Sequence, residues 1–396
     1  MEQSITPTKK RTPKWLLAIF PLLILILLIA LFGLLNPLAF FSDAFPPLEE
    51  LSVQRITFPQ EGQIELQLIN GGPDPVTIAQ VLVDDAYWQF TIDPDNTLSR
   101  LERATIHLSY PWVYDEPLAF RLITATGITF DAEVDVAVLA PQTGAPTFIA
   151  YGLLGIYVGV IPVALGMLWY PFMRRVDRKW INVLLALTVG LLLFLLVDTL
   201  LEALEISAVL PGAFQGVPLV AFGVLFSFGI LMAISQRRGH GSPMAIATFI
   251  ALGIGLHNLG EGLAIGAAFA TGAAALGSFL VIGFTLHNIT EGVAIAAPLT
   301  TQDERPKISA FIFLAFLAGA PAMLGTWIGG FAFNPLLAVL FLSFGAGAIL
   351  QVTWEVSRFL LRDAQRQGTT VVSWLNFAGL TAGILIMYLT AILVKF

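Results

Sequence analysis

The chain alternates between long stretches of apolar residues and one stretch in which apolar and polar residues take turns. Residues 15–35 form the first apolar stretch, and several more follow between residues 147 and 396. About 20 consecutive apolar residues are enough for a helix to cross the hydrocarbon core of a bilayer. The pattern therefore predicts an all-α polytopic membrane protein, with a transmembrane anchor over 15–35 and a helical domain over 147–396.

Polar and basic segments divide the helical domain into eight predicted transmembrane helices. Their predicted bounds are 147–172, 180–204, 216–236, 243–270, 275–299, 308–333, 335–361 and 372–394. Basic residues gather in every second connection between these helices. They are Arg174, Arg175, Arg178, Lys179, Arg237, Arg238, Arg305, Lys307, Arg358, Arg362 and Arg366. Because Lys and Arg remain on the cytoplasmic side, we expect an inner or plasma membrane protein with a cytoplasmic N-terminus and an extracytoplasmic C-terminus.

The first 14 residues form a short basic tail that includes Lys9, Lys10 and Arg11. This tail predicts that the N-terminus lies inside. Ala30 and Gly33 would permit cleavage after the apolar stretch, but a cleaved signal peptide has a shorter apolar region. We therefore expect an uncleaved anchor.

Residues 43–140 follow a different pattern, with period-two alternation in segments such as 63–69, 76–83, 104–108 and 130–139. Turn sequences rich in Gly, Pro, Asn and Asp separate these segments. Short alternating strands at this spacing predict a small all-β, immunoglobulin-like sandwich outside the membrane. The segment holds 16 acidic and 4 basic residues, a net charge of −12, which would attract cations or serve as an ordinary solvated surface.

Composition narrows the possible functions. Hydrophobic residues make up 57% of the chain and charged residues only 12%, as expected for an integral membrane protein. There is no Cys, which excludes disulfides, thiolate metal ligands and thiol catalysis. The net charge of −7 is not the basic footprint of a nucleic-acid-binding protein, so we expect no nucleic-acid partner.

Two predicted helices carry the same polar motif, His-Asn-x-x-Glu-Gly, which recurs 30 residues later. Its polar members are His257, Asn258, Glu261, His287, Asn288 and Glu291. A His and a Glu four residues apart lie on one face of a helix, and Asn borders the same groove. Carboxylates are costly to bury in lipid without a cation, although polar residues also join membrane helices by hydrogen bonds. The paired motifs therefore predict a metal site between the two helices.

The two motifs and the residues after them resemble the fourth and fifth transmembrane helices of the ZIP family of divalent-metal transporters. The resemblance is strong over 243–300, weaker over 147–396, and does not reach the first 140 or so residues. It implies an eight-helix core, a metal site between the motif helices, and transport of Zn²⁺ or a related ion (Fe²⁺, Mn²⁺ or Cd²⁺) toward the cytoplasm.

The chain departs from the family pattern at three positions. Gly260 and Thr290 stand where the family usually has Pro before each motif Glu, so a bend in each helix would be lost. Ala320 precedes Pro321, where many relatives have Glu. A second, bridged metal site would therefore lack a ligand, and we expect a mononuclear site.

Four other polar residues lie inside predicted helices. Asp198 and Glu202 share a face of the second helix of the domain and are candidates for an outer vestibule or a solvated helix end. Gln351 and Glu355 repeat this spacing in the seventh helix, where Glu355 is either part of the ion pathway or an ion-pair partner of Arg358.

Two classes of function follow, neither of them enzymatic. The first is a divalent-metal transporter that uses the six motif residues. The second is a membrane receptor or metal sensor that retains a degenerate transporter fold and whose exported domain binds a partner. An intramembrane metalloprotease is disfavoured because the His-Glu-x-x-His motif is absent. The expected partners are the metal ion and the lipid bilayer, and a homodimer stays open.

Overall fold

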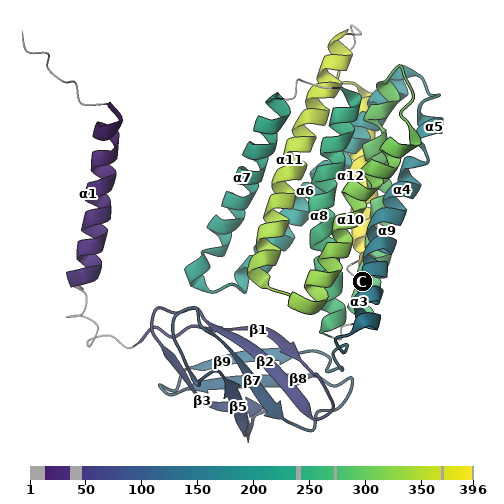
Figure 1. Cartoon of the computed structure of the whole chain (residues 1–396). Helices are drawn as coiled ribbons and strands as arrows, with labels where there is room; N and C mark the ends of the chain where they lie inside the picture. Colours follow the sequence, from purple (N-terminus) through teal and green to yellow (C-terminus); the bar gives the residue numbers. More distant parts are fainter. Residues whose placement is uncertain (1–13, 36–46, 238–241, 272–273, 367–369, 395–396) are drawn as a thin grey trace, which may run out of the picture. The chain divides into compact units, whose positions relative to one another are not determined.

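The computed structural model describes residues 14–35, 47–237, 242–271, 274–366 and 370–394. The chain divides into two compact units, Met1–Leu48 and Glu49–Phe396. In the first unit, helix α1 spans Lys14–Leu35, over the residues where the anchor is predicted (Figure 1). Residues 1–13 of the predicted basic tail lie outside the described residues.

The first part of the second unit is all-β. Its strands are β1 (Leu51–Thr57), β2 (Gln63–Asn70), β3 (Val76–Val83), β4 (Ala86–Trp88), β5 (Phe90–Asp93), β6 (Thr97–Leu98), β7 (Arg103–Ser109), β8 (Leu118–Thr124) and β9 (Thr129–Val134). All pairings are antiparallel and form two sheets, one ordered β1-β2-β7-β5 and the other β4-β3-β8-β9, with β6 paired to β3. The predicted small all-β region is thus present.

The alternation in the sequence sets which side chains of the β region are buried. On β2, Ile64 and Leu66 are buried, and their partners on β7 are Leu108 and Ile106. Phe120 of the other sheet belongs to the same core. Because successive side chains on a strand point to opposite faces, this spacing places the apolar side chains between the sheets.

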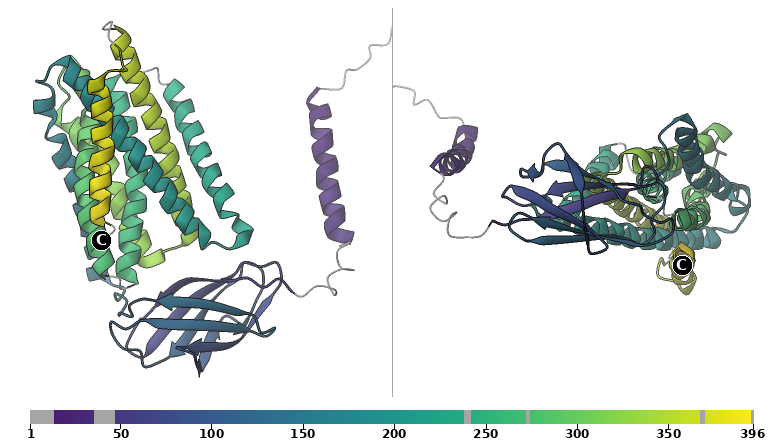
Figure 2. Two further views of the ribbon diagram at one scale, coloured as in Figure 1. Left: turned by 180° about the vertical axis from the view of Figure 1, so that it is seen from behind. Right: turned by 90° about the horizontal axis from the view of Figure 1, so that it is seen from below.

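Helices form the rest of the second unit. They are α3 (Ala145–Gly155), η1 (Ile156–Val160), α4 (Ile161–Met167), α5 (Tyr170–Met173), α6 (Arg178–Ala208), η2 (Gly212–Phe214), α7 (Gly216–Arg237), α8 (Pro243–Ala270), α9 (Ala274–Ala296), η3 (Pro298–Thr301), α10 (Ile308–Ala332), α11 (Pro335–Arg366) and α12 (Trp374–Val394). Figure 2 shows these helices running alongside one another in a bundle. Seven helical stretches of the described residues are long and apolar enough to cross a membrane.

These seven stretches make the chain a multi-pass membrane protein by length and hydropathy. The described apolar parts of α1 and α12 are shorter, 19–35 and 374–389. The total of nine spans therefore stays a prediction, and so does the orientation of the termini.

The first predicted span, 147–172, is not one regular helix. It consists of α3, α4 and α5, and a π-helical turn, η1, joins α3 to α4. Pro162 occupies the first turn of α4 and has no N–H to donate to the carbonyl of Val158. The carbonyl that this proline leaves free lies next to the motif helices, as described below.

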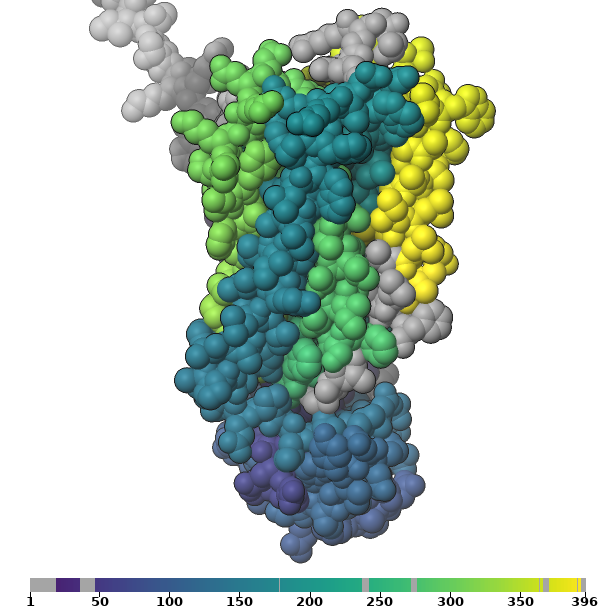
Figure 3. Space-filling view, turned by 90° about the vertical axis from the view of Figure 1, so that its right-hand side faces the viewer, coloured from purple at the N-terminus to yellow at the C-terminus, as the bar shows by residue number. Residues whose placement is uncertain are grey.

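Glycines bring pairs of helices into backbone contact. A Cβ added to Gly262 of α8 would overlap the carbonyl oxygen of Ala322 on α10, and one added to Gly292 of α9 would overlap that of Val163 on α4. Small residues allow membrane helices to approach this closely. Figure 3 views the helical bundle from one side and shows α3–α5 beside α9, with α12 on the other side of α9. Both motif helices are therefore held against a neighbour by backbone packing.

Candidate metal centre

Helices α8 and α9 pack against each other and carry one motif each. Ser242 caps α8 by accepting a hydrogen bond from the backbone N–H of Ala245, and Pro243 begins the helix, as is common at this position. Both helices continue through the motifs, in agreement with the absence of proline at Gly260 and Thr290. All six predicted ligands are buried: His257, Asn258, Glu261, His287, Asn288 and Glu291.

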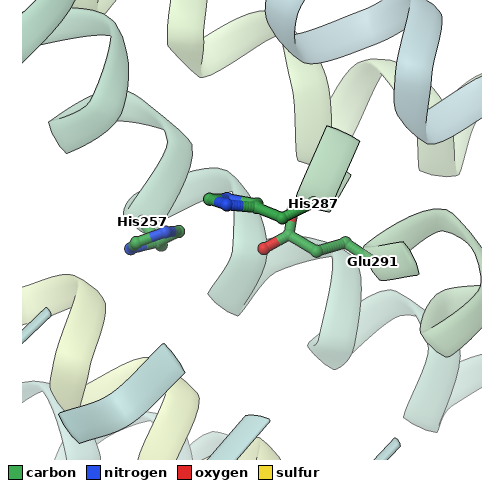
Figure 4. A group of neighbouring side chains, drawn as sticks. All are labelled: His257, His287 and Glu291. Atoms are coloured by element: carbon green, nitrogen blue, oxygen red, sulfur yellow. The ribbon is translucent and has the colours of Figure 1, made fainter. Parts of the chain in front are cut away.

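The two imidazoles and the two carboxylates meet between the helices. The ring centroids of His257 and His287 are 6.1 Å apart. Potential ligand atoms of His257, His287 and Glu291 lie within 4.8 Å of one another, and Figure 4 shows the three side chains converging. Glu261 belongs to the same group, because its Oε1 lies 3.0 Å from Nε2 of His257 and 2.5 Å from Nε2 of His287.

The asparagine amides are oriented by backbone carbonyls of neighbouring helices. Nδ2 of Asn288 donates to the carbonyl of Val158 at 3.0 Å. This is the carbonyl to which Pro162, having no N–H, cannot donate. Nδ2 of Asn258 donates to the carbonyl of Ala318 at 3.0 Å, one turn before Pro321. A carbonyl only accepts hydrogen bonds, so each amide must present its NH₂ there. The carbonyl oxygen of each asparagine is thereby left for another partner.

Several polar atoms of the motifs have no hydrogen-bond partner among the described residues. They are Oδ1 of Asn258, Nε2 of His287, Oδ1 of Asn288, and both Oε1 and Oε2 of Glu291. Nε2 of His287 contacts Glu261 at short range but without hydrogen-bond geometry. Buried polar atoms are normally paired, and an unpaired one costs about 1–3 kcal/mol. These atoms are nearly all acceptors, which is the kind of atom that binds a metal cation.

Thr199 of α6 adds a contact that the sequence analysis did not single out. Its Oγ1 lies 2.8 Å from Nδ1 of His257, and both side chains are buried. A threonine in an apolar helix carries no signal of this kind in the sequence, because the contact joins residues 58 positions apart.

The remaining predicted residues lie away from this group or at its edge. Asp198 and Glu202 are half-buried on α6, on either side of Thr199 in the sequence. Gln351 is buried on α11, and neither atom of its amide has a partner among the described residues. Glu355, also buried, accepts a hydrogen bond from Oγ of Ser235 on α7 at 2.6 Å. Its hydrogen-bond partner in the described residues is thus Ser235 and not Arg358, and the role of Glu355 stays a prediction.

The chain matches no family model and no curated protein.

Proposed function

We propose that this protein transports a divalent transition-metal ion across a membrane, with Zn²⁺ as the leading candidate, through a site between α8 and α9. The observation that carries the proposal is the set of unpaired acceptor atoms on buried Asn258, Asn288 and Glu291, beside two imidazoles. The ligands would be His257, Asn258, Glu261, His287, Asn288 and Glu291.

The charges of the group support a cation as its ligand. Glu261 and Glu291 are 1% and 2% exposed, inside helices that are otherwise mostly apolar. Removing a carboxylate from water costs several kcal/mol, and the cost is offset by protonation or by a partner of opposite charge. A divalent ion beside both carboxylates would provide that charge.

The ligand types favour a transition metal over Ca²⁺ or Mg²⁺. Calcium and magnesium sites use oxygen ligands, whereas imidazole nitrogen suits zinc, iron and related ions. The resemblance to ZIP transporters points the same way. Ala320, in place of the glutamate that many ZIP transporters have there, favours a single metal ion over a bridged pair.

Uptake of Zn²⁺ into vesicles that contain the purified full chain tests the proposal. We expect uptake by the unaltered protein and its loss in Glu291→Gln, which removes a charge and keeps the shape. Glu205→Gln is the control, because Glu205 is exposed on α6. Repeating the assay with Fe²⁺, Mn²⁺ and Cd²⁺ establishes which ion is preferred.

The assay also separates the two classes of function. Metal binding that depends on Glu291 but occurs without uptake would support a membrane receptor or metal sensor. If the protein neither binds nor takes up any of these ions, the proposed metal site is contradicted.

A further inference from the structure

Thr199 holds a position between a backbone carbonyl and a motif histidine. Its Oγ1 lies 2.8 Å from the carbonyl oxygen of Leu195, one turn earlier on α6, and 2.8 Å from Nδ1 of His257. Thr199 is 0% and His257 2% exposed. Water therefore does not compete for either contact.

The number of protons decides the direction of each hydrogen bond. A hydroxyl has one proton to donate, and a carbonyl oxygen can only accept. The proton of Thr199 is therefore donated to Leu195. Oγ1 can then only accept from Nδ1 of His257, so Nδ1 carries a proton.

We propose that Thr199 is a positioning residue that keeps Nδ1 of His257 protonated, so that Nε2 is the nitrogen presented to the metal ion. The inference rests on the proposed function and adds a residue of a third helix to the site. Nε2 lies on the side of Glu261, 3.0 Å from its Oε1, as the metal site requires. The hydrogen bond made by one ring nitrogen commonly determines which nitrogen of a ligating histidine binds metal.

Replacing Thr199 by Val keeps the shape of the side chain and removes the acceptor. Nδ1 of His257 then has no partner, and the neutral ring is more stable with its proton on Nε2, donated to Glu261. A metal ion must displace that proton and reorder the ring. The affinity for Zn²⁺ should fall by about 10- to 100-fold, the usual effect of losing such an outer partner. Thr199→Ser keeps a hydroxyl and should restore most of the affinity.

Thr188 offers a matched control on the same helix. It is also 0% exposed, and its hydroxyl donates to the carbonyl of Leu184 one turn earlier, at 3.0 Å. Among the described residues, its hydroxyl makes no hydrogen bond to a histidine ring. Thr188→Val therefore measures how Zn²⁺ affinity responds to the loss of a buried hydroxyl that bonds only to the backbone of α6. We expect this variant to leave the affinity unchanged.

The experiment measures Zn²⁺ binding to the full chain in detergent and records nitrogen-15 spectra of labelled histidine in the metal-free protein. The two neutral forms of imidazole have different spectra, and His257→Gln identifies the signals of His257. We expect a protonated Nδ1 in the unaltered protein, in Thr199→Ser and in Thr188→Val, and a shift of the proton to Nε2 in Thr199→Val. Thr199→Ala serves in its place if the valine variant does not elute as a folded protein.

The outcomes distinguish this inference from the proposed function. If the unaltered protein binds Zn²⁺ and Thr199→Val keeps both the affinity and the spectrum of His257, the positioning role is wrong and the metal site stands. If Thr188→Val weakens binding as much as Thr199→Val does, the effect is structural and the inference is overturned. If the unaltered protein binds no metal ion, the proposed function and the role of Thr199 toward a metal both fail.

Discussion

Oε1 of Glu261 lies 2.5 Å from Nε2 of His287, so a carboxylate of α8 reaches the imidazole of the neighbouring motif helix. The same oxygen is 3.0 Å from Nε2 of His257. A carboxylate between two imidazoles at these distances implies at least one proton in the group when no metal is present, since two bare acceptors repel each other. If the group binds a metal ion as proposed, binding must therefore release a proton through Glu261.

The first prediction concerns this proton. Glu261→Gln should weaken Zn²⁺ binding by about tenfold or more and reduce the number of protons released, because metal ligands must lose their protons to bind. For the same reason, the affinity of the unaltered protein should fall as the pH is lowered. Calorimetry in buffers of different ionisation enthalpy measures the proton count. Glu205→Gln, on the exposed side of α6, should change neither quantity. Unchanged affinity and proton release in Glu261→Gln would exclude Glu261 as a ligand.

The second prediction concerns the packing of α8 on α10. Gly262→Ala should lower the stability of the protein by about 1–3 kcal/mol, because the added methyl group overlaps the carbonyl oxygen of Ala322. Gly229→Ala on α7 is the control, since a Cβ there meets nothing within 4 Å. Thermal unfolding in detergent, followed by the loss of monodisperse protein, compares the two. Equal melting temperatures would show that the helices separate easily at this contact.

The third prediction concerns the core of the β region. Phe120 is 1% exposed between the sheets, whereas Tyr87 is 69% exposed. Phe120→Ala should destabilise this region by about 3–5 kcal/mol, since it removes a large buried side chain and leaves a cavity. Tyr87→Ala should have little effect. The susceptibility of residues 49–140 to limited proteolysis in the full chain reports the difference, and equal resistance of both variants would contradict the assigned core.

The fourth prediction concerns topology. The chain has no Cys, so single-Cys variants can be labelled one at a time. We expect Asp95→Cys to react from outside the cell and Arg175→Cys only after permeabilisation; both residues are exposed. Asn70, the last residue of β2, is unsuitable for this purpose, because it is 0% exposed and its amide donates to the backbone carbonyls of Asp74 and Leu98. Labelling of both positions from the same side would rule out the nine-span arrangement.

The sequence alone determined that this is a mostly helical membrane protein, and where in the chain its buried polar motifs lie. Apolar runs and period-two alternation depend only on neighbouring residues, so they predicted helices such as α8 and strands such as β3 within a residue or so of their observed ends. The spacing within each motif predicted, for the same reason, that its His and Glu share one face of a helix. Helical periodicity is local, and it orients side chains before any packing is known.

The tertiary structure decided the contacts between helices. The hydrogen bond of Thr199 to His257, the donation from Asn288 to Val158, and the pairing of Glu355 with Ser235 all join residues more than 50 positions apart. Each depends on how far one helix is rotated and shifted along its neighbour. Backbone contacts at glycines such as Gly262 and Gly292 set those offsets, and a glycine in the sequence does not reveal which carbonyl it will meet. The sequence could therefore predict which polar residues form the candidate site, but not the residues that orient them.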